Sequence, residues 1–176
     1  PTHQLLNQPL VFFIDDTVRW NPQNWDGSTS LLETMRYGLK KSLNLVSVRI
    51  VQELVTPRQI KKNAEQFGIT TNIRPVDAIA LGVSEVYPIE ITSAYAAIAN
   101  NGVLNKPQYI EKVEDRYGRV IKTFTTESSE VKDEALIFVI RDMMRSVVDD
   151  GTGSSLRWKY KFKNPIAGKT GTTNSK

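Results

Sequence analysis

The sequence predicts an α/β (α+β) fold in which helices pack beside antiparallel strands. Several segments repeat apolar residues at helical spacing and begin with capping residues, whereas residues 109–124 alternate around a turn as a β-hairpin does. A short apolar run near the N-terminus is typical of a buried strand. With 176 residues, 40% of them hydrophobic, the chain can form one sizeable core and is not a disordered polymer.

The chain begins with a predicted strand and a loop. Leu10–Ile14 is the apolar run that predicts a buried strand. Residues 19–27 contain Pro, Asn, Asp and Gly and are predicted to form a turn-rich loop. We expect its two tryptophans, Trp20 and Trp25, to pin this loop onto the core.

Two helices separated by a break are predicted next. Ser30 and Glu33 have the spacing of an N-terminal capping box, so a helix is predicted from Ser30 to about Lys41. Ser42-Leu43-Asn44 interrupts it with residues that prefer turns and caps. The apolar helical pattern resumes from Leu45 to Leu54.

Three further helices have clear start and stop signals. Proline at the first helical position and a closing glycine bound two of them, Thr56-Pro57 to Gly68 and Pro88 to Asn101 before Gly102. The second of these has an apolar stripe of Ile91, Ala94, Tyr95 and Ile98. The third helix, Asp133 to Asp150 before Gly151-Thr152-Gly153, has a stripe whose methionine is expected to fill the core: Leu136, Val139, Ile140, Met143 and Val147.

Strands complete the predicted elements. Tyr109–Val113 and Val120–Phe124 alternate around Asp115-Arg116-Tyr117-Gly118, which predicts a β-hairpin. Pro165–Thr173 is predicted to be a short strand. Its two glycines indicate that something approaches the backbone closely there.

Composition excludes several classes of function. The chain has no cysteine, so disulfide scaffolds, thiol nucleophiles and cysteine-based zinc sites are excluded. Its one histidine, His3, lies at the very start and is expected to be solvated, which leaves no base for a histidine-dependent triad. No run of about 20 apolar residues is present to span a membrane.

The net charge of +4 does not by itself predict nucleic-acid binding, because the basic residues are scattered. The densest patch is Arg157-Trp158-Lys159-Tyr160-Lys161-Phe162-Lys163. Alternating basic and aromatic residues occur on single-strand-binding surfaces, but also on amphipathic strands or loops with their charges in water. We favour the strand or loop and expect no nucleic-acid partner.

Two short motifs carry candidate chemistry. Ser42-Leu43-Asn44 offers a hydroxyl and an amide at a turn between helices. Lys169-Thr170-Gly171-Thr172, whose lysine lies 127 positions after Ser42, offers a positive charge, two hydroxyls and free backbone N–H groups. This set suits a carboxylate-bearing peptide and a developing oxyanion. Each motif alone also fits helix-break chemistry or an ordinary strand end.

Together the motifs resemble Ser-x-Asn and Lys-Thr-Gly, two of the three signature motifs of penicillin-binding proteins and serine β-lactamases. The likeness extends to segments similar to the transpeptidase domain of class A (bifunctional) penicillin-binding proteins. They are Pro22 to Gly27, Arg36 to Arg49, Ala80 to Glu90, Ala94 to Ala96, Ala99 to Gly102, Gly151 to Gly153 and Ala167 to Asn174. The fold that the resemblance implies is an antiparallel sheet flanked by helices, with a helical lobe.

One departure from the family pattern is large. The family's nucleophile motif, Ser-x-x-Lys, precedes Ser-x-Asn, but no such motif precedes Ser42 here. The one formal match, Ser129-Glu130-Val131-Lys132, lies in a polar linker without an apolar setting to lower the lysine pKa, and we interpret it as a decoy. We therefore expect residues 1–176 to be part of a single transpeptidase domain, with the nucleophile segment and C-terminal strands missing.

The resemblance implies a role for each matching residue in a serine acyl-enzyme reaction on D-Ala-D-Ala stem peptides. Ser42 would relay a proton toward the leaving group, and Lys169 would place positive charge near Ser42 and the substrate carboxylate. The remaining residues would bind substrate. Asn44 would hydrogen-bond to an amide carbonyl of the donor peptide, and the hydroxyls of Thr170 and Thr172 would bind the substrate carboxylate. Gly171 would allow the substrate to approach closely. The backbone N–H of Thr172 would form half of the oxyanion hole. Neither a metal nor a cofactor is implied.

The resemblance also implies properties of a longer parent protein. It would be a peptidoglycan D,D-transpeptidase inhibited by β-lactams, with a membrane anchor and a glycosyltransferase domain, on the extracytoplasmic face of the bacterial cytoplasmic membrane. Its partners would be peptidoglycan stem peptides and β-lactam antibiotics. We expect the fragment alone to be inactive and to self-associate. A penicillin-sensing module without enzymatic activity and a serine β-lactamase remain alternatives.

Overall fold

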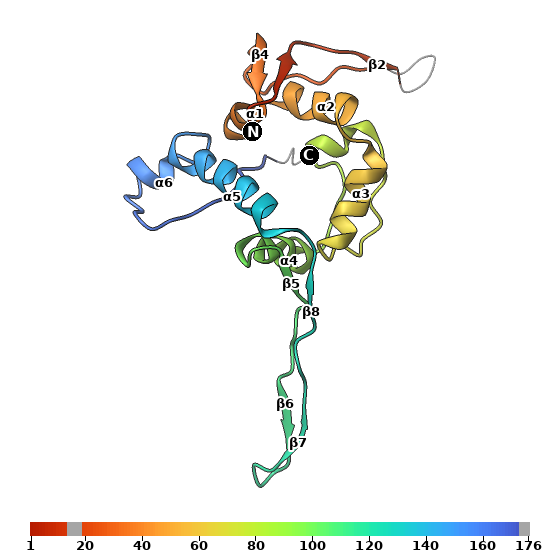
Figure 1. Ribbon diagram of the computed structural model, residues 1–176, viewed down its shortest axis with the longest axis vertical. Helices are drawn as coiled ribbons and strands as arrows, with labels where there is room; N and C mark the ends of the chain where they lie inside the picture. Colours follow the sequence, from red (N-terminus) through yellow and green to blue (C-terminus); the bar gives the residue numbers. More distant parts are fainter. Residues whose placement is uncertain (14–18, 173–176) are drawn as a thin grey trace.

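The computed structural model describes residues 1–13 and 19–172. Helices gather around the core, and a narrow two-stranded arm projects from them (Figure 1). The helices are α1 (Met35–Lys41), α2 (Asn44–Glu53), α3 (Pro57–Gln66), the 3₁₀ helix η1 (Asp77–Leu81), α4 (Pro88–Ala99), α5 (Glu134–Asp149) and α6 (Ser155–Trp158). None of the helices within the described ranges is long and apolar enough to cross a lipid bilayer.

The strands pair two by two, and every pair is antiparallel. The pairs are β1 (Gln4–Asn7) with β4 (Ser30–Thr34), β2 (Phe12–Phe13) with β3 (Arg19–Trp20), β5 (Val103–Asn105) with β8 (Ser128–Glu130), and β6 (Lys112–Glu114) with β7 (Val120–Thr123). The predicted mixture of helices and antiparallel strands is confirmed.

The predicted helix from Ser30 is wrong over its first five residues, which form β4 instead. Ser30 Oγ does contact Glu33 Oε1, at 2.7 Å, but both residues lie in a strand whose backbone pairs with β1. Helix α1 begins at Met35, where the Thr34 side chain accepts a hydrogen bond from the backbone N–H of Tyr37. A long-range strand partner has overridden the local capping signal.

Asparagines, rather than tryptophans, hold the loop of residues 19–27. Trp25 is 85% exposed, so the prediction that it pins the loop onto the core is wrong. Trp20 is half-buried and its ring lies 4.9 Å from that of Phe12. Asn24 is buried, donates to Asn7 Oδ1 at 2.8 Å, and accepts from the backbone N–H of Leu45 at 3.2 Å. It thereby ties the loop to the first turn of α2.

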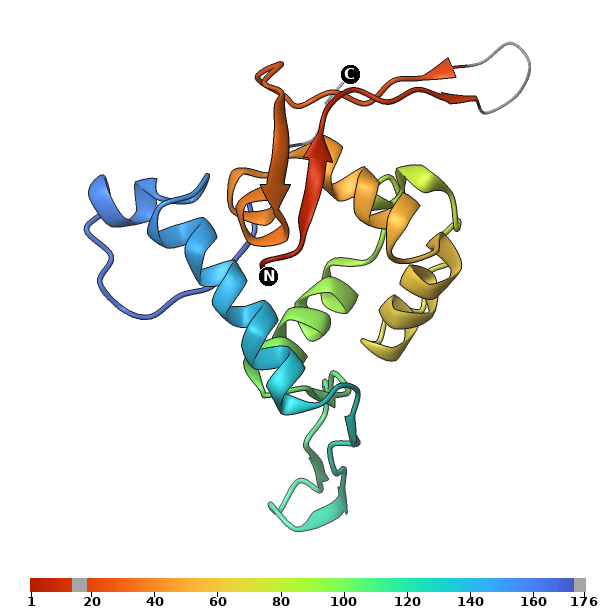
Figure 2. The same cartoon turned by 45° about the horizontal axis from the view of Figure 1, so that its top comes forward.

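The predicted buried strand near the N-terminus is also corrected. Leu10 is half-buried and Val11 is exposed, because the β2–β3 pair extends away from the helices as a short ribbon (Figure 2). Ile14, the end of the predicted strand, lies outside the described residues.

Helices α2, α3 and α4 follow their predicted boundaries. Thr56 and Gln59 form the capping box that begins α3, and Gly68 follows its end with a φ of +88°. The stripe predicted for α4 is only partly right, because Ala94 is buried but Ile91 and Tyr95 are exposed.

A buried carboxylate fixes the start of α4. Glu90 Oε1 accepts hydrogen bonds from the Thr70 hydroxyl at 2.5 Å and from the Thr70 and Thr71 backbone N–H groups. Its Oε2 accepts from the Thr71 hydroxyl and from the backbone N–H of Tyr87. These bonds, led by the Thr70 and Thr71 hydroxyls, lower the pKa of Glu90 from 4.5 to about 2.

The predicted hairpin is confirmed and forms the outer end of the projecting arm, which we define as residues 103–130. Strands β6 and β7 pair around the turn at Asp115, whose carboxylate accepts from the backbone N–H groups of Tyr117 and Arg119. The ribbon is exposed along both strands.

Helix α5 has a narrower buried face than predicted. Met143, Met144, Val147 and Val148 are buried, which confirms the methionine as core filler. Leu136 is 63% exposed, and Val139 and Ile140 are 37% exposed, so this half of the predicted stripe is not buried in the core.

Residues 165–172 form no strand, contrary to prediction, and Thr173 lies outside the described residues. The segment is extended, but within the described ranges no strand pairs with it. A strand requires a partner ladder, and this segment instead rests on α5.

Replacing Glu90 with glutamine in the full-length protein should lower the urea midpoint at pH 7, because a charged acceptor of several hydrogen bonds is lost. The depressed pKa means that the carboxylate stabilises the fold above pH 4.5 and that this contribution fades as pH falls toward 2. Urea titrations should therefore converge for wild type and Glu90→Gln at acidic pH. The exposed neighbour Glu85 offers a control, since Glu85→Gln should leave the pH 7 midpoint unchanged. A Glu90→Gln deficit that persists undiminished at pH 2 would contradict the assignment.

Residues 1–176 alone should self-associate and melt without a sharp transition. Helices α4 and α5 expose several large apolar side chains, and exposed apolar surface promotes association. These side chains are Ile91, Tyr95, Leu136, Phe138, Val139 and Ile140. Size-exclusion chromatography with light scattering and a thermal melt test this, and a monomer with a cooperative melt would contradict it.

Candidate functional site

The break between α1 and α2 presents Ser42. This residue has φ +56° and ψ +44°, the left-handed region, which costs energy for a residue with a side chain. Its backbone N–H caps α1 by bonding to the Leu39 carbonyl at 3.2 Å, and the next N–H, of Leu43, bonds to the Gly38 carbonyl at 2.9 Å. The turn is therefore over-determined, and the Ser42 hydroxyl stands at the end of a rigid helix.

Lys169 reaches this hydroxyl from the far end of the chain. Its Nζ donates to Ser42 Oγ at 2.7 Å and to the Thr170 carbonyl at 2.9 Å. The side chain is partly buried, and burial lowers the pKa of Lys169 below its ordinary value of 10.5. The structure thus brings together the two residues predicted to be catalytic.

Helix α5 and the turn after it hold the Lys169 segment in place. The backbone N–H of Gly168 bonds to the Met144 carbonyl at 3.3 Å. Two residues on, Thr170 Oγ1 and Thr152 Oγ1 lie 2.6 Å apart in a hydrogen bond. The segment is therefore fixed on both sides of Lys169.

The turn at Gly151 joins α5 to α1. The backbone N–H of Thr152 bonds to the Lys40 carbonyl at 3.2 Å, and that of Gly153 bonds to the Val147 carbonyl at 2.9 Å. A Cβ on Gly151 would lie 2.5 Å from the Lys40 oxygen and 2.7 Å from the Val147 oxygen, which is too close for any side chain. The turn therefore requires glycine at this position.

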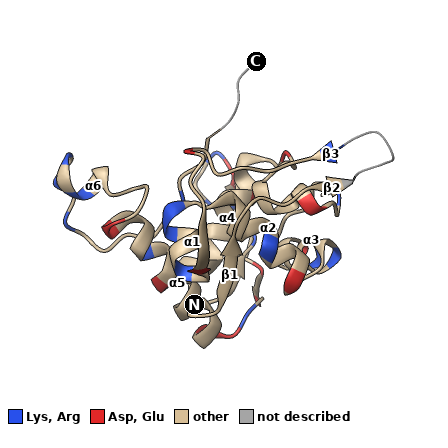
Figure 3. Ribbon diagram, turned by 90° about the horizontal axis from the view of Figure 1, so that it is seen from above, with Lys and Arg blue, Asp and Glu red and all other residues tan. Residues whose placement is uncertain are grey.

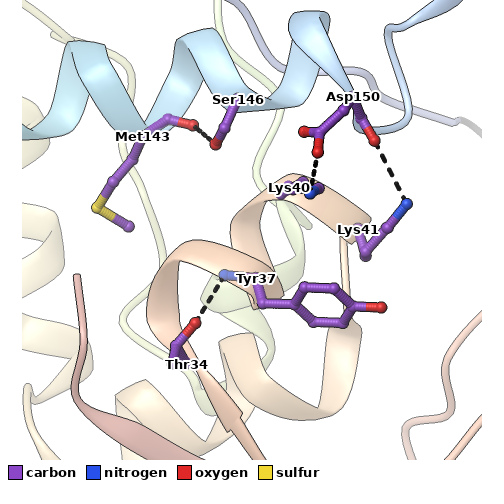
Figure 4. A network of polar contacts seen from close by, with 7 residues as sticks. All are labelled: Thr34, Tyr37, Lys40, Lys41, Met143, Ser146 and Asp150. Carbon is purple, nitrogen blue, oxygen red and sulfur yellow. Dashed lines mark hydrogen bonds and ion pairs between the residues drawn. The ribbon is translucent and has the colours of Figure 1, made fainter.

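Ion pairs reinforce the same junction (Figure 4). The Asp150 carboxylate pairs with Lys40 Nζ, and the Asp150 carbonyl accepts from Lys41 Nζ at 3.4 Å. At the start of α1, Arg36 Nη2 pairs with Asp142 Oδ2 at 2.6 Å. Partly exposed pairs of this kind contribute little energy each, so the backbone contacts carry the docking and the pairs set its register.

The other predicted site residues are placed less closely. Asn44 lies at the start of α2, where its Nδ2 donates to the Gln23 carbonyl at 2.8 Å. Gly171 and Thr172 are exposed and extend past Thr170. A Cβ on Gly171 would meet nothing within 4 Å, so the chain itself does not demand glycine there.

The interpretation of Ser129 as a decoy is supported by its surroundings. Ser129 lies in β8, exposed and paired with Leu104. Lys132 Nζ donates to Gln66 Oε1 at 2.8 Å, which turns the lysine toward α3. Within the described ranges, no group of three or more His, Cys, Asp or Glu residues gathers to hold a metal ion.

Sequence reasoning missed Thr152 and Gly151 as parts of the site. The glycine pair at Gly151 and Gly153 marked the end of a helix, and nothing in the local pattern indicated contact with α1 or with Thr170. The signal that could have found them was the likeness of Gly151-Thr152-Gly153 to a segment of the family, but this likeness assigned no role to Thr152.

Ser42 and Asn44 lie at the junction of α1 and α2, and Lys169 of a Lys-Thr-Gly segment donates a hydrogen bond to Ser42. These two motifs are characteristic of the penicillin-binding protein class. The sequence matches the family "Penicillin binding protein transpeptidase domain" over residues 11–176, and the chain belongs to that family.

Curated relatives are penicillin-binding proteins. The chain is 34% identical to penicillin-binding protein 1A of Aquifex aeolicus (strain VF5) over 155 residues, which cover 88% of this chain and 21% of the relative. It is 31% identical to penicillin-binding protein 2D of Bacillus subtilis (strain 168) over 164 residues, covering 89% of this chain and 23% of the relative. The chain thus spans about a fifth of the length of the curated relatives it matches. The resemblance to class A penicillin-binding proteins is confirmed.

Solved structures show the same fold. Penicillin-binding protein 1A from Haemophilus influenzae superposes with a TM-score of 0.90 at 23% identity, covering 99% of this chain and 31% of that chain. The D,D-transpeptidase domain of a peptidoglycan glycosyltransferase from Eggerthella lenta gives a TM-score of 0.78 at 20% identity, covering 98% of this chain and 48% of that chain. The predicted transpeptidase fold is confirmed.

Replacing Gly151 with alanine in the full-length protein should destabilise the junction by roughly 1–3 kcal/mol, as overpacking against backbone does. The matched control is Gly171→Ala, since a Cβ there meets open space and should change stability little. Thermal melts of both variants measure the difference. Equal melting temperatures would contradict the close approach of Gly151 to α1.

Proposed function

We propose that this chain supplies the relay and carboxylate-binding half of a peptidoglycan D,D-transpeptidase site that works through a serine acyl-enzyme. The observation that carries the proposal is the 2.7 Å contact between Lys169 Nζ and Ser42 Oγ, made between residues 127 positions apart. Membership of the transpeptidase family and the likeness to penicillin-binding proteins 1A support it.

The contact suits Ser42 to pass a proton. Lys169 donates to the Ser42 oxygen, so the hydroxyl hydrogen of Ser42 remains available to a second acceptor. In the proposed reaction a nucleophilic serine attacks the carbonyl carbon of the penultimate D-Ala. The bond to the terminal D-Ala nitrogen breaks, and the serine proton reaches that nitrogen through Ser42. The Lys169 charge stabilises negative charge that builds on the Ser42 oxygen during transfer.

The segment after Lys169 suits a carboxylate. Thr170 and Thr172 are exposed residues that carry hydroxyls, and the Lys169 ammonium group donates to the Thr170 carbonyl at 2.9 Å. Thr152 holds the Thr170 hydroxyl by a hydrogen bond, so the oxygen is already oriented before substrate arrives. We assign the carboxylate of the terminal D-Ala, or the equivalent group of a β-lactam, to these hydroxyls, and an amide carbonyl of the donor peptide to Asn44.

The nucleophile belongs, in this proposal, to a longer protein that carries Ser-x-x-Lys outside residues 1–176. Such a protein would be anchored in the cytoplasmic membrane with its transpeptidase domain on the extracytoplasmic face, and would carry a glycosyltransferase domain. Residues 1–176 alone would bind no penicillin covalently. The short share of the relatives that the chain spans supports this part of the proposal.

The full-length protein should react covalently with a fluorescent penicillin, and mass spectrometry should place the adduct on a serine outside residues 1–176. An adduct on Ser129 would contradict the decoy interpretation. A folded full-length protein without any adduct would contradict the proposed function. Hydrolysis of the adduct within seconds would favour the β-lactamase alternative.

Replacing Lys169 with alanine in the full-length protein should slow penicillin acylation by on the order of 100-fold, as loss of one preorganised charge does. Stopped-flow or gel-based labelling measures the rate. Lys163→Ala is the matched control, because Lys163 is an exposed lysine that comes shortly before residues 165–172 in the sequence. A Lys169→Ala rate within threefold of that control would indicate an ordinary solvated lysine.

The pH profile gives an independent readout. The proposed role needs charged Lys169, and burial lowers its pKa, so acylation should decline at a pH below 10.5 as the lysine deprotonates. Lys169→Arg keeps the charge to higher pH. This variant should retain residual acylation whose alkaline decline is shifted upward, and an unshifted decline would assign the titration to another group.

A further inference from the structure

The positive net charge of the chain is concentrated at one end. The 26 residues after Asp150 contain six of the 23 basic residues and none of the 19 acidic residues. The preceding 150 residues are therefore slightly acidic. Figure 3 shows basic residues on α6 and on the segment that leaves it. An anionic ligand would be attracted to the exposed lysines of this part of the sequence.

Residues 157–164 form a closed loop, which we call the aromatic–basic loop. Arg157 closes it: its Nε and Nη2 donate to Asp149 Oδ1 at 3.0 and 2.8 Å, and its Nη1 donates to the carbonyls of Phe162 and Asn164, each at 2.8 Å. The backbone N–H of Phe162 also bonds to the Leu156 carbonyl. The predicted strand or loop with its charges in water is found as a loop with exposed lysines, but Arg157 and Trp158 belong to α6 and Arg157 is half-buried.

The loop holds aromatic rings and lysines in water together. Trp158 and Tyr160 are each 64% exposed, and Lys159 Nζ lies 5.4 Å from the centre of the Tyr160 ring. Lys161 and Lys163 are also exposed. Because Arg157 fixes the loop at its base, these groups stay displayed instead of collapsing onto α5, and little ordering is needed when they bind.

We propose that the aromatic–basic loop is a second binding surface for the polymeric substrate, taking an anionic glycopeptide strand. The lysines would bind carboxylates of the stem peptides, and Trp158 and Tyr160 would stack on pyranose rings. The inference rests on the proposed function, because it names the substrate of that site as a strand and not only a peptide terminus.

Continuity with the candidate site favours a glycopeptide over a lipid surface. The loop leads directly into residues 165–172, and both are fixed to α5, the loop through Asp149 and the segment through the Met144 carbonyl. A strand held on the loop would therefore be held relative to Lys169. A lipid surface would gain nothing from that connection.

Sedimentation with purified peptidoglycan sacculi tests the proposal, using full-length protein whose active site has first been acylated with penicillin. One loop variant removes three exposed charges by combining Lys159→Gln, Lys161→Gln and Lys163→Gln. It should weaken binding to sacculi by about tenfold. A second, Trp158→Ser with Tyr160→Ser, should weaken it at any salt concentration. Two control variants in the arm should bind as wild type does. The first combines Lys106→Gln, Lys112→Gln and Lys122→Gln and matches the lysine variant, and the second combines Tyr109→Ser with Tyr117→Ser and matches the aromatic variant.

Penicillin labelling of the same samples separates this inference from the proposed function. Loop variants should label within about twofold of wild type, because the small β-lactam does not need the loop. If wild-type protein fails to react with penicillin, the proposed function is contradicted. Binding of the same protein to sacculi would still test the loop. Sacculus binding equal in loop and arm variants would overturn the inference. So would loop variants that lose binding to phosphatidylglycerol vesicles or a single-stranded oligonucleotide but keep binding to sacculi.

Discussion

The close approach of the Gly151 turn to the end of α1 is the constraint on which the arrangement of the site depends. The backbone N–H of Thr152 reaches the Lys40 carbonyl only because Gly151 has no side chain, since a Cβ would lie 2.5 Å from that oxygen. This contact sets the end of α5 against the residues just before Ser42. The same turn supplies Thr152 to Thr170, so one short segment positions both halves of the candidate site.

The geometry that follows places a charge against a hydroxyl whose own position is strained. Ser42 occupies the left-handed region and is held there by two backbone hydrogen bonds at the end of α1. Lys169 reaches it from a segment that is fixed on both sides, at Gly168 and at Thr170. A fixed hydroxyl and an anchored lysine suit a proton relay, because neither group has to be brought into place before the proton moves. Burial lowers the pKa of Lys169, so this lysine loses its charge at a lower pH than an exposed lysine does.

Locally encoded elements could be predicted from the sequence, and those that depend on distant partners could not. The helix start at Thr56-Pro57 and the turn at Asp115 depend on residues that are close in the sequence, and both formed as predicted. Ser30 and Glu33 had an equally good local signal, but pairing with β1 made them a strand. Helical spacing identified α5 without saying which apolar residues would be covered, so Leu136 was wrongly placed in the core. In the site, family likeness rather than periodicity connected Ser42 with Lys169, and neither predicted the contact of Thr152.

A double-mutant cycle on Ser42 and Lys169 tests the central claim most directly. Acylation by penicillin would be measured in the full-length protein for Ser42→Ala, Lys169→Ala and the pair, with thermal melts confirming that each variant folds. If the two side chains act through their 2.7 Å contact, the double variant should be slower than the slower single variant by no more than about threefold. Rate losses that simply multiply would show that the residues act independently and would contradict the account.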